Sequence, residues 1–173
     1  LRYQSIRYLG KIGTWEVLSF LEKLLNNKDS RIVFYVLKAI GKKAWPEIFP
    51  LLKKMTRHKD AIVRRQVFQV LSYLPAQLVA ELPDDACEDT DPLVRLAAGV
   101  ALNRPGVCGK VFAASLKNDD FGVRSAAARV LGKFPHEDRI NLLAQALNDP
   151  NSRVRTAAIR ATGMMGGASA FPF

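Results

Sequence analysis

Hydrophobic residues recur along this chain at the spacing of one face of a helix. Three segments align without gaps, and each begins with an aspartate: DAIVRRQVFQVL at Asp60, DPLVRLAAGVAL at Asp91 and DFGVRSAAARVLG at Asp120. With the aspartate counted as offset 0, apolar or small residues stand at offsets 3, 7 and 11 in all three. These offsets lie on one side of a helix with about 3.6 residues per turn, so each segment predicts an amphipathic α-helix.

The same pattern continues through the rest of the chain. The segment from Asp29 has Val33 where the others have arginine at offset 4, and the segment from Asn151 has asparagine in place of the aspartate. The chain starts inside a sixth copy, at offset 3. Residues at offset 3 are spaced by 31, 31, 31, 29 and 31 positions, and they are Leu1, Ile32, Val63, Val94, Val123 and Val154. A regular period of this length predicts stacked helical repeats.

Start and stop signals agree with these helices. An aspartate or asparagine at offset 0 suits the N-cap, where its side chain accepts a backbone N–H and meets the positive end of the helix dipole. At offset 12 four copies have a glycine, which predicts a left-handed residue that ends the helix. These glycines are Gly10, Gly41, Gly132 and Gly163.

Shorter apolar segments lie between these helices, and prolines such as Pro46, Pro75 and Pro135 introduce several of them. The segments run from Trp15 to Leu25, Ile48 to Met55, Leu78 to Leu82, Val111 to Leu116 and Ile140 to Leu147. Each repeat is therefore a predicted helical hairpin, which must stack on its neighbours to bury its apolar stripe. The prediction is an all-α fold, an α-solenoid of about six stacked two-helix repeats without a β-sheet.

Residues 1–167 are predicted to form one repeat domain, and residues 168–173 a flexible tail. Because Leu1 enters in the middle of a helix, we expect the domain to belong to a longer chain. Upstream sequence or a second copy would then cover the apolar end of the first repeat.

Composition supports a globular protein and limits its chemistry. Of the 173 residues 49% are hydrophobic and 24% charged, and no apolar run is long enough to span a membrane. Cys87 and Cys108 show no metal-ligand spacing, so we expect reduced thiols in a cytoplasmic protein. The net charge of +10 is uneven: residues 1–70 contain 15 Lys or Arg against 5 Asp or Glu, and residues 71–173 contain 11 of each.

Two charged stretches interrupt the pattern. Between Glu81 and Asp91 six carboxylates occupy eleven residues, and Pro83 should end a short helix and leave a loop. The spacing matches no calcium loop, so we interpret it as solvated, with contact to a basic partner as the alternative. The basic cluster from Lys53 to Lys59 is interpreted as a solvated face, with contact to acidic lipid or nucleic acid as the alternative.

The motifs DPLVRLAAGVAL, DDFGVRSAAARVLGKF and DPNSRVRTAAIRATG resemble HEAT-like repeats, specifically the short bacterial type first associated with phycobilisome lyases. This resemblance implies that the arginine at offset 4 bonds to an aspartate of the neighbouring repeat, and that the second helix of each pair lines a concave face. The implied structural ladder comprises Asp60, Arg64, Asp91, Arg95, Asp120, Arg124 and Arg155. Val33 leaves one step of that ladder in doubt.

Basic residues recur on the side of these helices that faces away from the apolar stripe. At offsets 9 and 13, eight of twelve positions are basic and none is acidic, and aromatic residues stand nearby. The predicted partner-binding residues are Arg7, Lys11, Lys38, Lys42, Arg104, Arg129, Lys133, Arg160, Tyr3, Phe34 and Tyr35. Stabilisation of the helix dipole is the alternative explanation, mainly for offset 13.

Catalytic patterns are not found in the sequence. The two histidines, His58 and His136, lie in different repeats, and no glycine-rich phosphate loop occurs. Trp15 and Trp45 are interpreted as packing residues between repeats. We therefore predict a non-catalytic protein-interaction scaffold without cofactor or metal, whose basic concave face binds an acidic protein surface or segment. Binding of nucleic-acid backbone is the alternative, and a HEAT-like DNA glycosylase or a chromophore lyase is less favoured.

Overall fold

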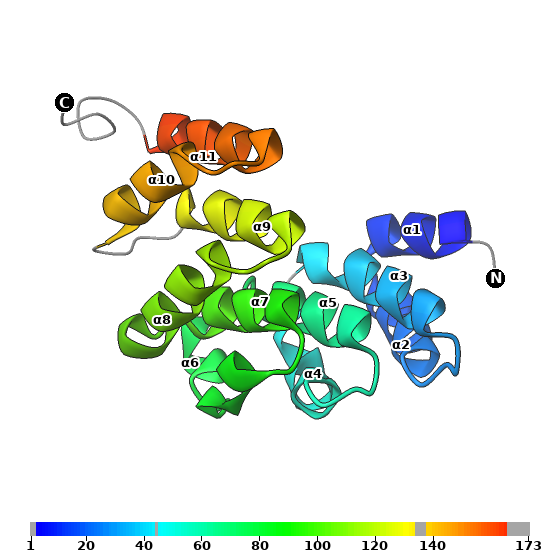
Figure 1. Cartoon of the computed structure of the whole chain (residues 1–173). Coiled ribbons are helices and arrows are strands. Elements are labelled where there is room, and N and C mark those ends of the chain that lie inside the picture. The colour runs from blue at the N-terminus through cyan, green and yellow to red at the C-terminus, as the bar shows by residue number, and fades with distance from the viewer. Residues whose placement is uncertain (1–2, 44, 134–137, 166–173) are drawn as a thin grey trace. The chain divides into compact units, whose positions relative to one another are not determined.

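The computed structural model describes residues 3–43, 45–133 and 138–165 (Figure 1). Over these residues the chain forms eleven α-helices joined by short turns and three short 3₁₀ helices, and no strand occurs among them. The predicted all-α class is confirmed. The tail predicted at residues 168–173 lies outside the described residues.

Six helices correspond to the six copies of the repeated segment, and we call them the second helices of the repeats. They are α1 (Tyr3–Ile12), α3 (Ser30–Ile40), α5 (Ala61–Leu71), α7 (Pro92–Leu102), α9 (Phe121–Leu131) and α11 (Ser152–Met164). The first helices lie between them, as α2 (Trp15–Leu24), α4 (Phe49–Met55), α6 (Ala76–Val79), α8 (Pro105–Leu116) and α10 (Arg139–Leu147). The alternation of the two kinds confirms the predicted hairpins.

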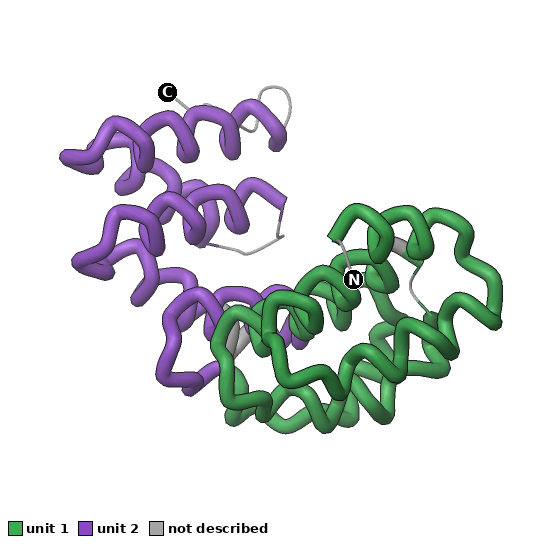
Figure 2. Tube along the Cα trace, turned by 90° about the vertical axis from the view of Figure 1, so that its right-hand side faces the viewer, with its two compact units in different colours: residues 1–86 green, residues 87–173 purple. Residues whose placement is uncertain are grey.

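The helices group into two compact units, residues 1–86 and residues 87–173 (Figure 2). In unit 1, α3 packs between α1 and α5, while α2 and α4 pack against them from one side. In unit 2, α9 packs between α7 and α11, and α8 and α10 take the places of the first helices. Each unit is thus stacked as in an α-solenoid.

The core follows the predicted register. Val63, Val94 and Val154 at offset 3 are fully buried, and so are the residues at offset 7 from α3 to α11. In the second repeat the burial shifts by one position, because Val33 is fully buried whereas Ile32 is only half-buried. An apolar residue at offset 4 therefore joins the core where the other repeats have arginine.

Each second helix from α3 onward begins in the same hydrogen-bonded turn. The side chain at offset 0 accepts the backbone N–H two residues later, over 2.7–2.9 Å, at Asp29, Asp60, Asp91, Asp120 and Asn151. The side chain two residues before it accepts the N–H of the cap residue itself, at Asn27, His58, Asp89, Asn118 and Asp149. These bonds satisfy donors that a helix start otherwise leaves without partners.

The prediction of left-handed glycines at the helix ends is wrong. Gly10 and Gly163 lie inside helices, and Gly41 and Gly132 have right-handed backbone angles. The left-handed residue at this offset is instead Asn103, with φ of 47°.

Three of these glycines, Gly10, Gly41 and Gly132, allow close packing between repeats. A Cβ on Gly10 would lie 2.6 Å from the Cβ of Ala39, and one on Gly132 would lie 2.6 Å from the Cα of Ala161. Ala39 and Ala161 both stand at offset 10 of the following repeat. Glycine is therefore selected by the approach of the next helix and not by a backbone angle.

The fourth repeat departs most from the others. Its first helix, α6, ends at Val79, four residues before Pro83, in agreement with the predicted early end. The acidic segment that follows is not wholly a loop, because Asp84–Glu88 form a 3₁₀ helix with Cys87 buried beneath it.

Candidate functional site

The second helices contain no acidic residue. Every aspartate or glutamate in the described part of the chain lies on a first helix, in a 3₁₀ helix, in a turn or at a cap. Basic residues occur on all six second helices. Within each unit, the charged side chains on the exposed side of the second helices are therefore all positive.

In unit 1 the predicted basic positions are solvent-exposed. Arg7 and Lys11 are exposed on α1, and Lys38 is exposed on α3 one repeat later. On α5 the equivalent position holds Gln69, which is also exposed. The side chain of Lys42 lies outside the described residues.

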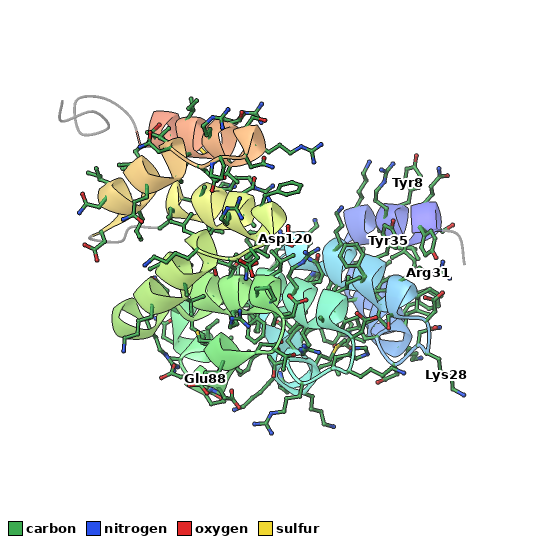
Figure 3. All side chains as sticks on the ribbon, viewed as in Figure 1. Tyr8, Lys28, Arg31, Tyr35, Glu88 and Asp120 are labelled. Carbon is green, nitrogen blue, oxygen red and sulfur yellow. The ribbon has the colours of Figure 1, made fainter. Side chains whose placement is uncertain are left out.

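Aromatic rings accompany these cations on α1 and α3. The ring centroids of Tyr3 and Tyr35 lie 4.4 Å apart with planes at 32°, and Phe34 meets Tyr35 edge-on at 5.4 Å. The Nζ of Lys38 lies 6.0 Å from the centre of Phe34. Tyr3 and Tyr35 are each 37% exposed, so the pair is open to a partner on one side. Figure 3 shows Tyr35 and Tyr8 on these two helices.

Arg31 adds a cation that the sequence prediction missed. It lies one turn before Tyr35 on α3, and its Nε is 3.2 Å from Oδ1 of Asp29. This contact and the backbone N–H of Arg31 hold the pKa of Asp29 below its usual value. Arg31 stands at offset 2, which also faces away from the apolar stripe, whereas the predicted cations stand at offsets 9 and 13.

In unit 2 the same offsets are basic but lack the aromatic pair. Arg129, Lys133 and Arg160 are exposed, whereas Arg104 is half-buried at the N-cap of α8. Around the exposed arginines the positions that match Tyr3 and Tyr35 hold small residues, namely Ser125, Ala126, Thr156 and Ala157.

The ladder arginines hold the turns between paired helices. In Arg64, Arg95, Arg124 and Arg155 the Nη1 donates to the two carbonyls that precede the N-cap residue of its own repeat. Arg124 also reaches the next repeat, where its Nε and Nη2 bond to Asp149 at 2.7 and 3.1 Å. The aspartate contacted across repeats is therefore two positions before the cap, which differs from the expected ladder of capping aspartates.

The Arg124–Asp149 pair is well shielded from solvent. The two side chains are 14% and 8% exposed. Hydrogen bonds from the Arg124 guanidinium lower the pKa of Asp149, and the carboxylate raises the pKa of Arg124. Bidentate pairing of this kind fixes the relative position of two repeats.

The acidic segment and the basic cluster, which are separate features in the sequence, contact each other within unit 1. Lys53 Nζ lies 3.4 Å from Glu81, and an Arg57 Nη lies 3.3 Å from Asp85. All four side chains are exposed. The interpretation of both stretches as purely solvated faces is thus incomplete, because each partly neutralises the other.

Catalytic or cofactor-binding geometry is not found in the described part of the chain. The Nδ1 of His58 accepts the N–H of Asp60 at 3.0 Å and so belongs to a helix cap, and His136 lies outside the described residues. Those residues contain no cluster of metal-ligating side chains and no helix suited to crossing a membrane. A depression beside Leu18 and Trp45 has a cavity volume of about 10 Å³, far below the ~300 Å³ of small ligand pockets.

Trp15 does not pack between repeats as expected, because it is 56% exposed at the start of α2. Trp45 is half-buried and lines the depression beside Leu18.

Stacked helical hairpins with recurrent polar turns define a helical-repeat protein. The sequence matches HEAT repeats over residues 1–72 and 109–173, and the chain belongs to this family. No curated protein matches it.

Solved structures agree on the fold. An engineered protein is similar with a TM-score of 0.52 at 18% identity, covering 94% of this chain and 91% of the other. A second engineered protein has a TM-score of 0.50 at 20% identity, covering 94% and 89%. A designed armadillo repeat protein in complex with the peptide (KR)4 has a TM-score of 0.49 at 12% identity, covering 95% and 91%.

Proposed function

We propose that this protein is a non-catalytic interaction scaffold that binds an acidic protein surface or segment on the basic, concave side of its second helices. The observation that carries the proposal is the distribution of charge: exposed cations recur at one offset while all six helices lack carboxylates. Membership of the HEAT-repeat family supports a binding role, since repeat stacks present extended surfaces.

Helix capping does not account for this distribution. Cations in the last turn stabilise the helix dipole by about 0.3–1 kcal/mol, which can explain Lys11 or Lys38. Arg7 and Arg160 lie before the last turns of α1 and α11, where this effect has faded. Complementarity to a negatively charged partner explains the four positions named here by a single cause. They are Arg7, Lys11, Lys38 and Arg160.

The experiment is binding of a fluorescent peptide of alternating Asp and Glu, measured by anisotropy. The variant Arg7→Gln, Lys38→Gln, Arg129→Gln, Arg160→Gln should weaken binding about tenfold or more with helical content unchanged. The matched control, Lys53→Gln with Arg57→Gln, removes two exposed cations from elsewhere and should change affinity less than twofold. Equal losses in both variants would contradict the proposal, and so would failure of the unmodified protein to bind.

Binding to nucleic-acid backbone is the second candidate, favoured by the same exposed cations. Salt separates the candidates quantitatively, because each neutralised phosphate of duplex DNA contributes about −0.9 to the slope of log K against log salt. Retention of duplex DNA with a steep slope, lost in the four-residue variant, would favour this candidate. The DNA glycosylase and the chromophore lyase remain less favoured, since the second helices offer no carboxylate for catalysis.

We also propose that the repeats are of the short bacterial subtype and that the protein is cytoplasmic. The 31-residue period supports the subtype. Cys87 and Cys108 lack metal-ligand spacing in the sequence, which supports reduced thiols and a reducing compartment.

A further inference from the structure

Unit 1 differs from unit 2 in having an aromatic pair beside its exposed cations. We infer that the α1–α3 face, defined by Tyr3, Arg7, Phe34, Tyr35 and Lys38, is an anchoring site for acidic peptide segments that contain an aromatic residue among their carboxylates. This inference rests on the proposed function and names the kind of segment that the scaffold would hold.

The rings form a fixed and partly open surface. Tyr3 comes from α1 and Tyr35 from α3, so contact between their rings depends on the stacking of two repeats. Phe34 is half-buried and supports Tyr35 edge-on. Because neighbouring rings already restrict Tyr35, a partner loses less side-chain entropy by packing on it.

The cations stand where carboxylates flanking an aromatic anchor would reach them. Arg7 follows Tyr3 by four residues on α1, and Lys38 follows Phe34 by four on α3, so each cation lies one turn from a ring. The nearby carboxylate of Asp29 already pairs with Arg31. The face therefore combines an apolar centre with a positive margin, which complements an acidic segment with an aromatic anchor.

Ring geometry favours a peptide over single-stranded nucleic acid. A stacking platform for bases needs an open ring face. At 4.4 Å and 32°, Tyr3 and Tyr35 each cover one face of the other, which reduces the ring surface left for a stacked base. An aromatic side chain can pack edge-to-face against such a pair, which contributes about 0.5–1.5 kcal/mol beyond the area it buries.

The experiment compares three labelled peptides on the full chain: alternating Asp and Glu with a central Phe, the same peptide with Ala in place of Phe, and the Phe peptide with Asn and Gln in place of the acids. We expect the first to bind about fivefold more tightly than the second. The third should bind at least as weakly as the second.

The variant Tyr3→Ser with Tyr35→Ser should abolish the preference for Phe while retaining affinity for the Ala peptide. A matched control exists in unit 2, where Phe121 is 38% exposed with Arg153 lying 5.6 Å from its ring. Phe121→Ser should leave the preference unchanged. Circular dichroism of both variants checks that the helices persist. If a serine variant is unstable, Tyr35→Phe provides a second test, because it keeps the ring and should therefore retain the preference for Phe.

The outcomes separate the two proposals. Binding of the Ala peptide without preference for Phe would overturn this inference and leave the scaffold proposal standing. Failure of every acidic peptide would overturn both. A deoxythymidine oligonucleotide that binds more tightly than the Phe peptide, and loses affinity in the tyrosine variant, would overturn the peptide assignment.

Discussion

The two units have the same arrangement of helices but differ at the ladder position and on the exposed face of the second helices. In unit 1, Val33 replaces the ladder arginine of the second repeat while Arg64 keeps it in the third, and the exposed face contains paired tyrosines. In unit 2, Arg95, Arg124 and Arg155 all hold their turns, and the matching face contains small residues. Unit 1 also has the greater excess of charge, with 15 Lys or Arg against 8 Asp or Glu, compared with 11 against 8 in unit 2. A repeat can thus keep its core register while exposed positions diverge.

A different polar contact links two repeats in unit 1. The Ser30 hydroxyl donates to the carboxylate of Asp60 in the following repeat and is the main cause of the lowered pKa of Asp60. This bond has one neutral partner, whereas the Arg124–Asp149 contact in unit 2 is an ion pair. We therefore expect contacts between repeats to be more sensitive to mutation in unit 2.

The largest difference in stability between variants of the two units is expected at the glycines that contact the following repeat. In Gly132→Ala the new Cβ meets backbone atoms of Ala161, at 2.6 Å from Cα and 3.1 Å from the carbonyl oxygen, so α11 must shift. We expect a loss of about 2–3 kcal/mol in the free energy of unfolding, measured by urea titration. In Gly41→Ala the contact at 2.7 Å is a methyl of Val70, and we expect about 1 kcal/mol.

Gly163 provides the control for both variants, because nothing lies within 4 Å of its Cβ position and it stands within α11. Gly163→Ala should stabilise the protein by about 0.5–1 kcal/mol. Hydrogen exchange should locate each loss in the unit that holds the mutation. Equal stabilisation by all three alanines would show that helix propensity, and not contact between repeats, decides.

Removal of the shielded ion pair should have the next largest effect. Asp149→Ala leaves the Arg124 guanidinium without its carboxylate and the Asn151 N–H without an acceptor. We expect a loss of about 2–3 kcal/mol in the free energy of unfolding. The counterpart in unit 1, Ser30→Ala, should cost about 1 kcal/mol. A larger loss for Ser30→Ala would reverse the proposed ranking of the units.

Lowering the pH should destabilise both units, because each contains an aspartate that is hydrogen-bonded in its charged form. The pKa values of Asp60 and Asp149 lie below their usual value, because Ser30 and Arg124 respectively bond to the charged forms. Their contribution is therefore complete above the unfolded pKa of about 3.9 and is lost as pH falls through the folded values.

Urea midpoints measured from about pH 7 to about pH 3 should fall for the unmodified protein, and they should fall less steeply for Asp149→Asn, which lacks this titrating group. Identical slopes for both proteins would show that Asp149 does not contribute to the acid sensitivity.

The smallest effect is expected at the exposed pairs of unit 1. Lys53→Gln with Arg57→Gln removes both contacts to the acidic segment, whose partners are 55% and 60% exposed. Surface pairs typically contribute about 0–1 kcal/mol, so we expect a total loss below about 1 kcal/mol that vanishes in high salt. A loss comparable to that of Asp149→Ala would mean that this contact is structural.

Local features of the fold were predictable from the sequence. The offset-3 valines and the five caps depend on interactions within a few residues, so the repeat predicted both the buried face and the helix starts. The position two residues before each cap is equally regular in the sequence and could have revealed the second hydrogen bond of the cap. It holds Asn27, His58, Asp89, Asn118 and Asp149. The exposure of Arg7, Lys38, Arg129 and Arg160 also followed from periodicity alone.

Amphipathic spacing and capping act within single repeats, so they were enough to predict the helices, their order and the face that each one buries. The contacts of Gly132 with Ala161, of Arg124 with Asp149 and of Tyr3 with Tyr35 are visible only in the folded chain. These contacts join residues 25 to 32 positions apart. Their partners depend on how closely one hairpin stacks on the next, and no local pattern encodes that distance.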